Sequence, residues 1–182
     1  MDGTDFRIQQ VLPFSTTWNS HKFKGPGVRY EVGIAIQTGW IVWTAGPYRA
    51  HVPDIEIFRN ELKAQLLKTP GERVEADAGY GGEHGLVDLP DDMIGSSRTQ
   101  KKAKSIVRSR HETCNKRFKQ FNCLKQVFRH ELFRHKYCFE AVVVLTQLMI
   151  QNGYPLFEVK YKTRLYPTFD WFDVNIIALT KI

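Results

Sequence analysis

Three acidic residues, Asp2, Asp77 and Glu112, have the type and setting to do chemistry. Asp2 begins a predicted strand, Asp77 ends another beside glycines, and Glu112 lies in a strongly basic stretch. Strand ends next to glycines lie at the edge of a sheet where α/β proteins commonly build their sites. Converging carboxylates repel unless a cation neutralises them, and such oxygen ligands suit Mg²⁺ or Mn²⁺. A metal there would activate water and stabilise the charge of phosphodiester cleavage.

Each acid also has a purely structural interpretation. Asp2 could be an ordinary residue near the chain terminus, and Asp77 could cap the glycine loop that follows it. Glu112 could pair with Arg108 or Lys116, each four residues away on the same helix. Spacing alone favours these structural roles for each acid taken separately.

The predicted helix around Glu112 presents cations beside the carboxylate. Arg108 precedes Glu112 by four residues and Lys119 follows it by seven, so all three share one helix face. Cations so arranged suit the phosphates of a nucleic acid backbone. Arg108, Lys116 and Lys119 are therefore the predicted DNA-binding residues.

The net charge of +7 comes from one part of the chain. Residues 98–136 carry 13 Lys and Arg against two acids, a balance of +11, whereas all other residues together carry −4. A concentrated basic face of this kind indicates a polyanionic partner, most simply nucleic acid. The alternative is a solvated helix face with many cations.

Length and composition limit the class of protein. A chain of 182 residues with 42% hydrophobic and 25% charged residues fits one globular domain, with or without an appendage. No apolar run approaches the ~18 residues of a membrane span, and residues 1–15 contain no secretory h-region. Three Cys without a C-x-x-C pair favour a reducing compartment over a disulfide framework or a zinc site.

The first half of the chain predicts strands followed by a helix. Residues 1–12 alternate weakly and predict a strand. Residues 28–37 and 40–44, separated by a turn, predict an antiparallel hairpin. Asp54 is the predicted N-cap of a helix that Thr69-Pro70-Gly71 ends.

The second half predicts a short strand and two helices. The strand covers residues 73–76 and leads into a glycine-rich loop. One helix begins near residues 101–104 and runs past Lys119, and an apolar helix covers residues 137–151. The stripe expected to be buried on the first helix consists of Val107, Cys114, Phe118 and Phe121. The order of elements predicts a mixed α/β fold in which helices cover a sheet.

Four ordered motifs resemble the DDE superfamily endonuclease domain of transposases, and most closely that of the PIF/Harbinger elements. They are DGTDFRI at 2–8, GPYRAHVPDIEIFR at 46–59, ERVEADAGYGG at 72–82 and RSRHETCNKRFKQF at 108–121. The resemblance spans roughly residues 2–159. It implies an RNase H-like mixed sheet covered by helices, a divalent metal cofactor (Mg²⁺ or Mn²⁺) and cleavage of DNA.

The resemblance also implies roles for single residues. Asp2 matches the first catalytic and metal-binding acid, in DGT, and Asp77 matches the second, in ADAGY. Glu112 matches the third, in the R-x3-E-x6-K pattern that begins at Arg108 and ends at Lys119.

Two further positions matter to the resemblance. Ser105 stands where related transposases often carry Tyr, and Asp54 matches a recurrent acid of the family. Because Asp54 suits the start of a helix, we predict a capping role for it and keep it outside the triad.

The resemblance sets the remaining expectations. We expect an endonuclease domain over residues 1–159, an unassigned tail over 160–182, and an N-terminal truncation, since family members carry residues before the first catalytic Asp. The expected partner is DNA, with a second copy or a separate DNA-binding protein as further partners and no membrane. Nuclear residence follows from a DNA substrate and a basic cluster at residues 98–104. The alternative function is an inactive remnant that binds DNA or a protein.

Overall fold

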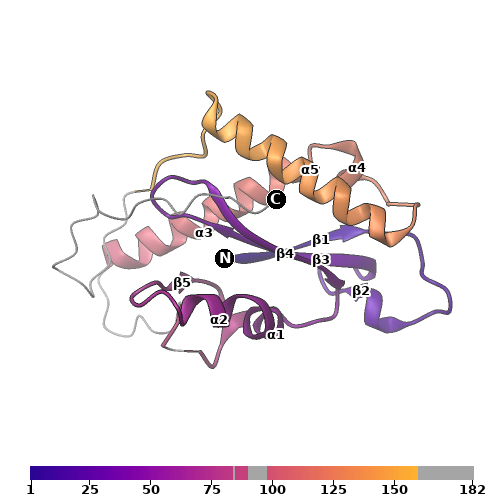
Figure 1. Cartoon of the computed structure of the whole chain (residues 1–182), viewed down its shortest axis with the longest axis horizontal. Coiled ribbons are helices and arrows are strands. Elements are labelled where there is room, and N and C mark those ends of the chain that lie inside the picture. Colours follow the sequence, from indigo (N-terminus) through magenta and orange to yellow (C-terminus); the bar gives the residue numbers. More distant parts are fainter. Residues whose placement is uncertain (84, 90–97, 160–182) are drawn as a thin grey trace.

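The computed structural model describes residues 1–83, 85–89 and 98–159 (Figure 1). The strands are β1 (Asp2–Arg7), β2 (Asn19–Ser20), β3 (Gly25–Ile34), β4 (Ile41–Arg49), β5 (Val74–Glu75) and β6 (Val87–Asp88). The helices are α1 (Asp54–Ile57), α2 (Lys63–Leu66), α3 (Arg98–Phe118), α4 (Asn122–Lys125) and α5 (Leu132–Gln151), with short helical turns η1 (Thr16–Trp18), η2 (Phe58–Leu62) and η3 (Ala78–Tyr80). The expectations for residues 90–97 and for the tail at 160–182 lie outside the described residues.

The main sheet is antiparallel and centres on β3. β3 pairs with β1 on one side and β4 on the other, while β2 pairs with the start of β3. The register sets Asp2 opposite Val32 and Gly3 opposite Glu31. The first residues of β1 therefore lie beside the second half of β3.

A small parallel pair, β5 and β6, lies next to the start of β1. The backbone nitrogen of Met1 donates a 2.7 Å hydrogen bond to the carbonyl oxygen of Glu75, the last residue of β5. The strand that begins with Asp2 and the strand that precedes Asp77 therefore meet at one edge.

Helices cover both faces of the sheet, as Figure 1 shows. α3, α4 and α5 pack on one face and enclose a core that includes Phe6, Tyr30, Phe118 and Phe139. The helical segment at 54–66 packs on the other side, around Met1, Phe58, Leu62 and Tyr80. The predicted mixed α/β class, with helices covering a sheet, is confirmed.

The hairpin prediction is confirmed, and its strands are longer than the pattern indicated. β3 already begins at Gly25, because β2 pairs with Gly25 and Pro26 and so draws the predicted turn into the sheet. β4 continues to Arg49, well beyond the predicted end at residue 44. The glycine of the turn, Gly39, has φ +75°, which explains the choice of glycine there.

The prediction that Asp54 caps the first helix is wrong. Pro53 is the N-cap and Asp54 is the first helical residue, without a side-chain cap bond. Oδ1 of Asp54 instead accepts a 2.7 Å hydrogen bond from Nη1 of Arg29. A charge-assisted bond in a half-buried setting is stronger than a cap, which explains where this carboxylate points.

The helix α3 ends at Phe118, slightly before the predicted end, and Val107, Cys114 and Phe118 are buried as expected. The apolar helix α5 begins at Leu132, five residues earlier than predicted. The short elements α4 and β6 had no signal in the sequence pattern. Within the described residues, no helix has both the length and the apolar character that crossing a membrane requires.

Candidate active site

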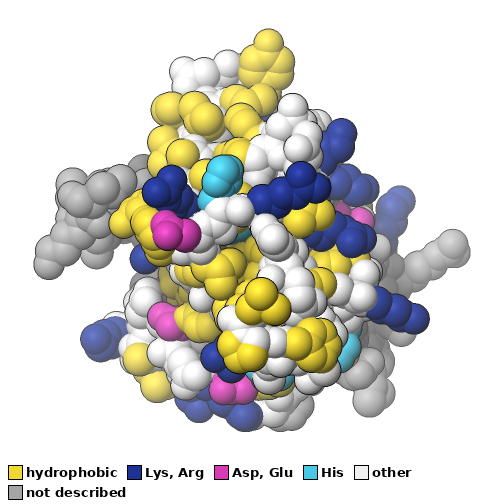
Figure 2. Space-filling view, turned by 90° about the vertical axis from the view of Figure 1, so that its right-hand side faces the viewer, with side chains coloured by type: hydrophobic (Ala, Val, Ile, Leu, Met, Phe, Trp, Pro, Cys, Tyr) yellow, Lys and Arg dark blue, Asp and Glu magenta, His cyan; other side chains and the backbone are white. Residues whose placement is uncertain are grey.

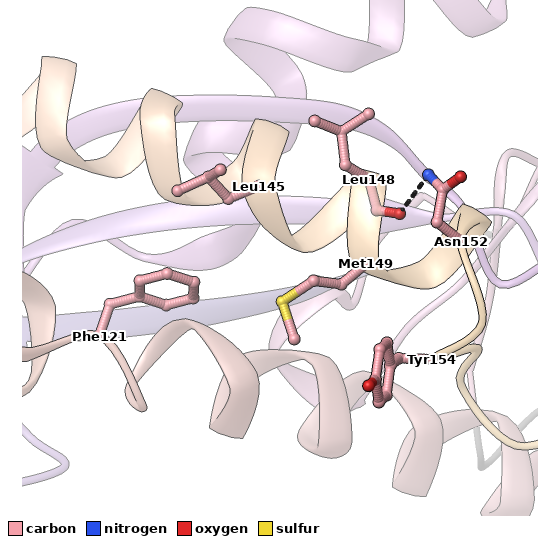
Figure 3. A pocket seen from close by; sticks show the side chains of 6 residues that line it. All are labelled: Phe121, Leu145, Leu148, Met149, Asn152 and Tyr154. Atoms are coloured by element: carbon pink, nitrogen blue, oxygen red, sulfur yellow. Dashed lines mark hydrogen bonds between the residues drawn. The ribbon is translucent and has the colours of Figure 1, made fainter.

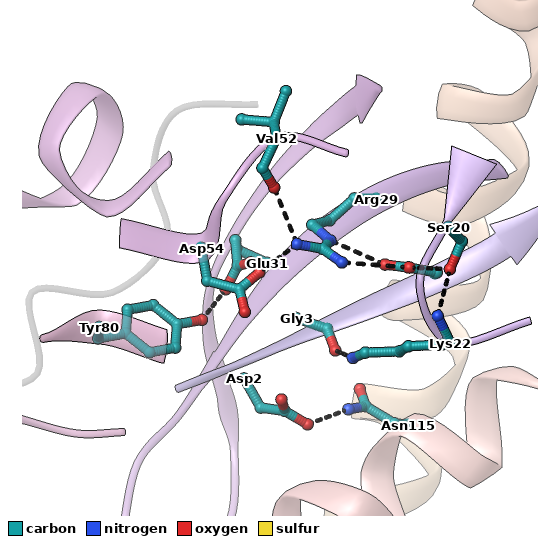
Figure 4. Close-up of polar contacts among 11 residues, drawn as sticks. Asp2, Gly3, Ser20, Lys22, Arg29, Glu31, Val52, Asp54, Tyr80 and Asn115 are labelled. Atoms are coloured by element: carbon teal, nitrogen blue, oxygen red, sulfur yellow. Dashed lines mark hydrogen bonds and ion pairs between the residues drawn. The ribbon is translucent and has the colours of Figure 1, made fainter. Parts of the chain in front are cut away.

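Asp2 lies at a pocket of about 240 Å³ between β1 and α3. Its Oδ2 accepts a 2.8 Å hydrogen bond from Nδ2 of Asn115 (Figure 4). Burial raises the pKa of the Asp2 carboxyl above its ordinary value; Lys22 opposes the shift, and the charges of Asp77 and Asp54 add to it. A carboxylate in this setting favours a neutralising partner, either a proton or a cation.

Asp77 lies in the loop between β5 and η3, and its side chain is exposed. Its Oδ1 accepts a 2.8 Å hydrogen bond from the backbone nitrogen of Gly79, so it does cap the turn. The capping interpretation is therefore correct for this bond. The loop nevertheless lies near β1, since the negative charge of Asp77 contributes to the raised pKa of Asp2.

Glu112 is exposed on α3 and lines the same pocket as Asp2. Within the described part of the chain, no ion pair joins Glu112 to Arg108 or to Lys116. The helix therefore brings this carboxylate to the pocket, where Lys116 and Lys119 of the same helix also lie.

The three acids do not form a ready metal site in the described part of the chain. The structure brings Asp2 and Glu112 to one pocket and sets Asp77 within electrostatic reach of Asp2. Among residues 1–83, 85–89 and 98–159, no three His, Cys, Asp or Glu side chains stand close enough to hold one metal ion. Their oxygen donors suit a hard divalent cation by type, and the triad as a metal centre stays a prediction.

Cations line the pocket together with Asp2 and Glu112. Lys116 and Lys119 of α3 and Lys22 of the loop after β2 all contribute to its wall. Burial lowers the pKa of Lys119, whose Nζ lies 5.5 Å from the centroid of the Phe6 ring. Arg108 is exposed and does not line the pocket, so the structure separates it from the other predicted cations.

A larger pocket, of about 360 Å³, lies away from these groups (Figure 3). It is lined by Phe121, Leu145, Leu148, Met149, Asn152 and Tyr154. This lining contains no carboxylate, cation or imidazole, so it lacks groups for acid–base or metal chemistry. We therefore assign the candidate chemistry to the smaller, polar pocket at Asp2.

Sequence reasoning missed three residues at or beneath the polar pocket. Lys22 donates from Nζ to the carbonyl oxygen of Gly3 at 2.5 Å, and Asn115 holds Asp2. Glu31 is fully buried beneath the site. In β3, Arg29 and Glu31 alternate with apolar residues and are buried, because helices cover both faces of the sheet. Two charged residues in such a strand were the signal in the sequence for a buried polar network.

Cations also lie at the far end of β1 from Asp2. Figure 2 views the molecule from the end where β1 finishes and α4 lies, and shows Lys and Arg side chains among hydrophobic ones and some acids. Arg7 stacks its guanidinium over the Phe23 ring, with Cζ 4.4 Å from the centroid. Such a surface favours a polyanion.

Comparison with known proteins identifies a family. A family model described as DDE superfamily endonuclease matches residues 1–147, well over half of the chain. No curated protein and no solved structure matches. The mixed α/β architecture, with its antiparallel sheet and covering helices, is consistent with the RNase H-like fold of DDE transposases.

Proposed function

The chain belongs to the DDE superfamily endonuclease family, and we propose that it cleaves DNA phosphodiester bonds with Asp2, Asp77 and Glu112 around a divalent metal ion. The observation that carries the proposal is one pocket that joins two of these acids, from β1 and α3, to three lysines. Acids and cations in one pocket match the two needs of the reaction, a charged reacting centre and a held phosphate backbone.

In this proposal, each residue of the pocket has a role that follows from its chemistry. Lys116 and Lys119 bind the phosphate backbone, and Asn115 orients Asp2 through its 2.8 Å hydrogen bond. A Mg²⁺ or Mn²⁺ ion held by Asp2, Asp77 and Glu112 would supply the positive charge that activates water and stabilises negative charge on the phosphate. Because the acids stand too far apart to hold one ion as they are, ion binding has to draw Asp77 and Glu112 toward Asp2.

Within the family, we propose a PIF/Harbinger-like transposase domain that acts in the nucleus. The support is the set of ordered motifs, above all ADAGY around Asp77 and R-x3-E-x6-K around Glu112. A transposase of this kind uses the freed 3′-hydroxyl for strand transfer, and we propose the same second step here. The domain would then extend over residues 1–159, with the tail outside it.

The test of cleavage is nicking of supercoiled plasmid DNA by the purified chain with Mn²⁺. We expect nicking by the wild-type protein and a loss of at least about 100-fold in Asp77→Asn and in Glu112→Gln, since each removes a metal-binding charge. Glu140→Gln, which neutralises an exposed glutamate on α5, is the matched control and should nick like the wild type. Activity retained in Asp77→Asn would exclude the proposal.

A second candidate function is a DNA-binding module without catalysis. The observation that favours it is that no three suitable side chains within the described residues stand close enough to hold an ion. A binding module would retain salt-sensitive DNA binding in EDTA and in Glu112→Gln, with no nicking under any condition. Loss of DNA binding on removal of metal would argue against this second candidate.

A further inference from the structure

A buried polar network lies beneath the candidate site and has no part in the proposed cleavage step (Figure 4). Its centre is Glu31 of β3, which is fully buried and stands opposite Gly3 in the register. Tyr80, also fully buried, donates its hydroxyl to Oε2 of Glu31. Because Tyr80 ends the η3 turn that Asp77 begins, this bond ties the loop of the second acid to the sheet.

Asp54 and Arg29 extend the network across the sheet (Figure 4). Arg29 donates through Nη1 to Oδ1 of Asp54 at 2.7 Å and through Nε to Oδ1 of Asp5 at 2.9 Å. The Asp5 side chain is fully buried in β1, and Asp54 begins α1. The network therefore fixes α1 against the strand that carries Asp2.

Two glycines leave room for the carboxylates of this network. A Cβ atom at Gly3 would lie 2.7 Å from Oε1 of Glu31 and 2.9 Å from Oδ1 of Asp54. A Cβ atom at Gly79 would lie 2.9 Å from Oδ1 of Asp77 and 3.3 Å from Oδ2 of Asp54. Asp54 thus stands between the residue after Asp2 and the loop of Asp77.

Glu31 joins its two neighbours as a neutral acid. Burial raises the pKa of Glu31 to about 9, and the negative charge of Asp54 is the second cause of this shift. Glu31 therefore carries a proton at neutral pH. Its Oε2 accepts the hydroxyl of Tyr80, and a side-chain hydrogen bond links it to Asp54.

We propose that Tyr80, Glu31 and Asp54 form a positioning relay that holds the loop of Asp77 against the strand of Asp2 and thereby sets the affinity of the site for its metal ion. The inference rests on the proposed function, because it assumes that Asp2 and Asp77 bind a shared ion. Tyr80 and Glu31 act through Asp77 and need not touch metal or DNA. Loss of the relay should therefore lower the affinity for the metal ion more than it lowers the rate of DNA cleavage at saturating metal.

The test compares Tyr80→Phe with Tyr48→Phe in the full chain. Tyr48 also donates to a carboxylate, that of Glu61, but lies on β4 outside the relay. Mn²⁺ affinity is measured by the electron paramagnetic resonance signal of free Mn²⁺, and the Mn²⁺ concentration for half-maximal nicking is measured in parallel. We expect Tyr80→Phe to weaken both by roughly 10- to 100-fold, with the rate at saturating Mn²⁺ retained, and Tyr48→Phe to change neither.

A second pair of variants separates hydrogen bonding from packing. Glu31→Gln keeps an oxygen that accepts from Tyr80 and gains an N–H that donates to Asp54, so it should bind Mn²⁺ like the wild type. Glu31→Leu keeps the bulk but loses both bonds, and should match Tyr80→Phe. Thermal melting of each variant records the stability cost separately.

Several outcomes would overturn the inference. Tyr80→Phe with a lower melting temperature but unchanged Mn²⁺ affinity would leave the network a purely structural role. Equal damage in Glu31→Gln and Glu31→Leu would show that the hydrogen bonds are not responsible. A wild-type chain that binds Mn²⁺ without nicking DNA refutes the proposed function, while the relay is still judged by binding; a wild-type chain that binds no Mn²⁺ refutes both.

Discussion

Burial controls the protonation of single side chains in this protein well away from the pocket. His135 of α5 is fully buried, and its Nδ1 lies 2.9 Å from the hydroxyl oxygen of Tyr30. The rings of Phe6 and Phe128 pack against it, with centroids 5.7 and 4.8 Å away. Desolvation lowers the pKa of His135 to about 4, so the imidazole is neutral in the folded protein near neutral pH.

Acid should therefore weaken the fold. The unfolded chain binds a proton at His135 near pH 6.5, whereas the folded chain resists it down to about pH 4. The free energy of unfolding should fall as the pH drops through this window, by on the order of 3 kcal/mol from this group. His111, also buried with a lowered pKa, acts in the same direction.

Urea unfolding at pH 7, 5 and 4 measures this loss. His135→Gln removes the titrating group and should lose less stability on acidification than the wild type, with His111 responsible for part of the remainder. An identical pH dependence in the two proteins would contradict the assignment to His135.

At the scale of elements, β3 holds the sheet and the helix α1 together through a buried ion pair. The side chains of Arg29 and Asp5 are 7% and 0% exposed, and the guanidinium also reaches Asp54. Removing one partner of such a pair leaves an uncompensated buried charge, which is costly.

Asp5→Ala should lower the free energy of unfolding by about 3–5 kcal/mol, because the Arg29 guanidinium would remain buried with only Asp54 to compensate it. Chemical denaturation measures the change. Glu131→Ala, which breaks an exposed pair with Arg134 in α5, should leave the midpoint near that of the wild type. Similar midpoints for the two variants would mean that the buried pair contributes no more than a surface one.

A substitution at Gly3 would test how closely β1 approaches the side chains of Glu31 and Asp54. Gly3→Ala would set a methyl group 2.7 Å from Oε1 of Glu31, whose side chain is buried and bonded, so it cannot easily move. Overpacking of this kind costs roughly 1–3 kcal/mol. Gly85→Ala meets open space and is the control; equal melting temperatures for both variants would contradict the close approach.

The sequence predicts those elements whose pattern is local. Alternation in β3, an apolar run in β4 and apolar spacing in α5 were enough to predict that these elements exist, although their bounds differ from the predicted ones. The role of Asp54 was predicted wrongly because its side chain pairs with Arg29, which is 25 residues away in the sequence, and does not cap the helix. Glu31 was missed for the same reason: only the covering helix and Tyr80 make its strand face an interior one.

The candidate site was predictable only as a set of residues. The motifs identify Asp2, Asp77 and Glu112, and the structure sets two of them at one pocket. Their spacing in three dimensions depends on loops and on any bound ion, which no sequence pattern encodes.

At the scale of the whole molecule, the uneven distribution of charge is the main property that would attract DNA. The +11 of residues 98–136 lies largely on α3 and the helices that follow it, whereas the rest of the chain is slightly acidic. DNA binding by such a surface releases counterions and weakens as salt rises.

Lys116→Ala should lower the dependence of duplex DNA affinity on salt, with the slope of log K against log salt reduced by about 0.9 for one lost phosphate contact. Fluorescence anisotropy with a labelled duplex at several salt concentrations measures it. Lys68→Ala removes an exposed cation outside residues 98–136 and should leave the slope unchanged. Unchanged slopes in both variants would remove Lys116 from the DNA interface.

The hydrogen bonds at Asp2 and Asp77 share one feature. Oδ2 of Asp2 accepts a hydrogen bond from Asn115, and Oδ1 of Asp77 accepts one from the backbone amide of Gly79. In each carboxylate one oxygen accepts a hydrogen bond from the chain, and under the proposed function the other oxygen would coordinate the metal ion. Both side chains would then have lost rotational freedom on folding, which would lower the entropic cost of binding the ion.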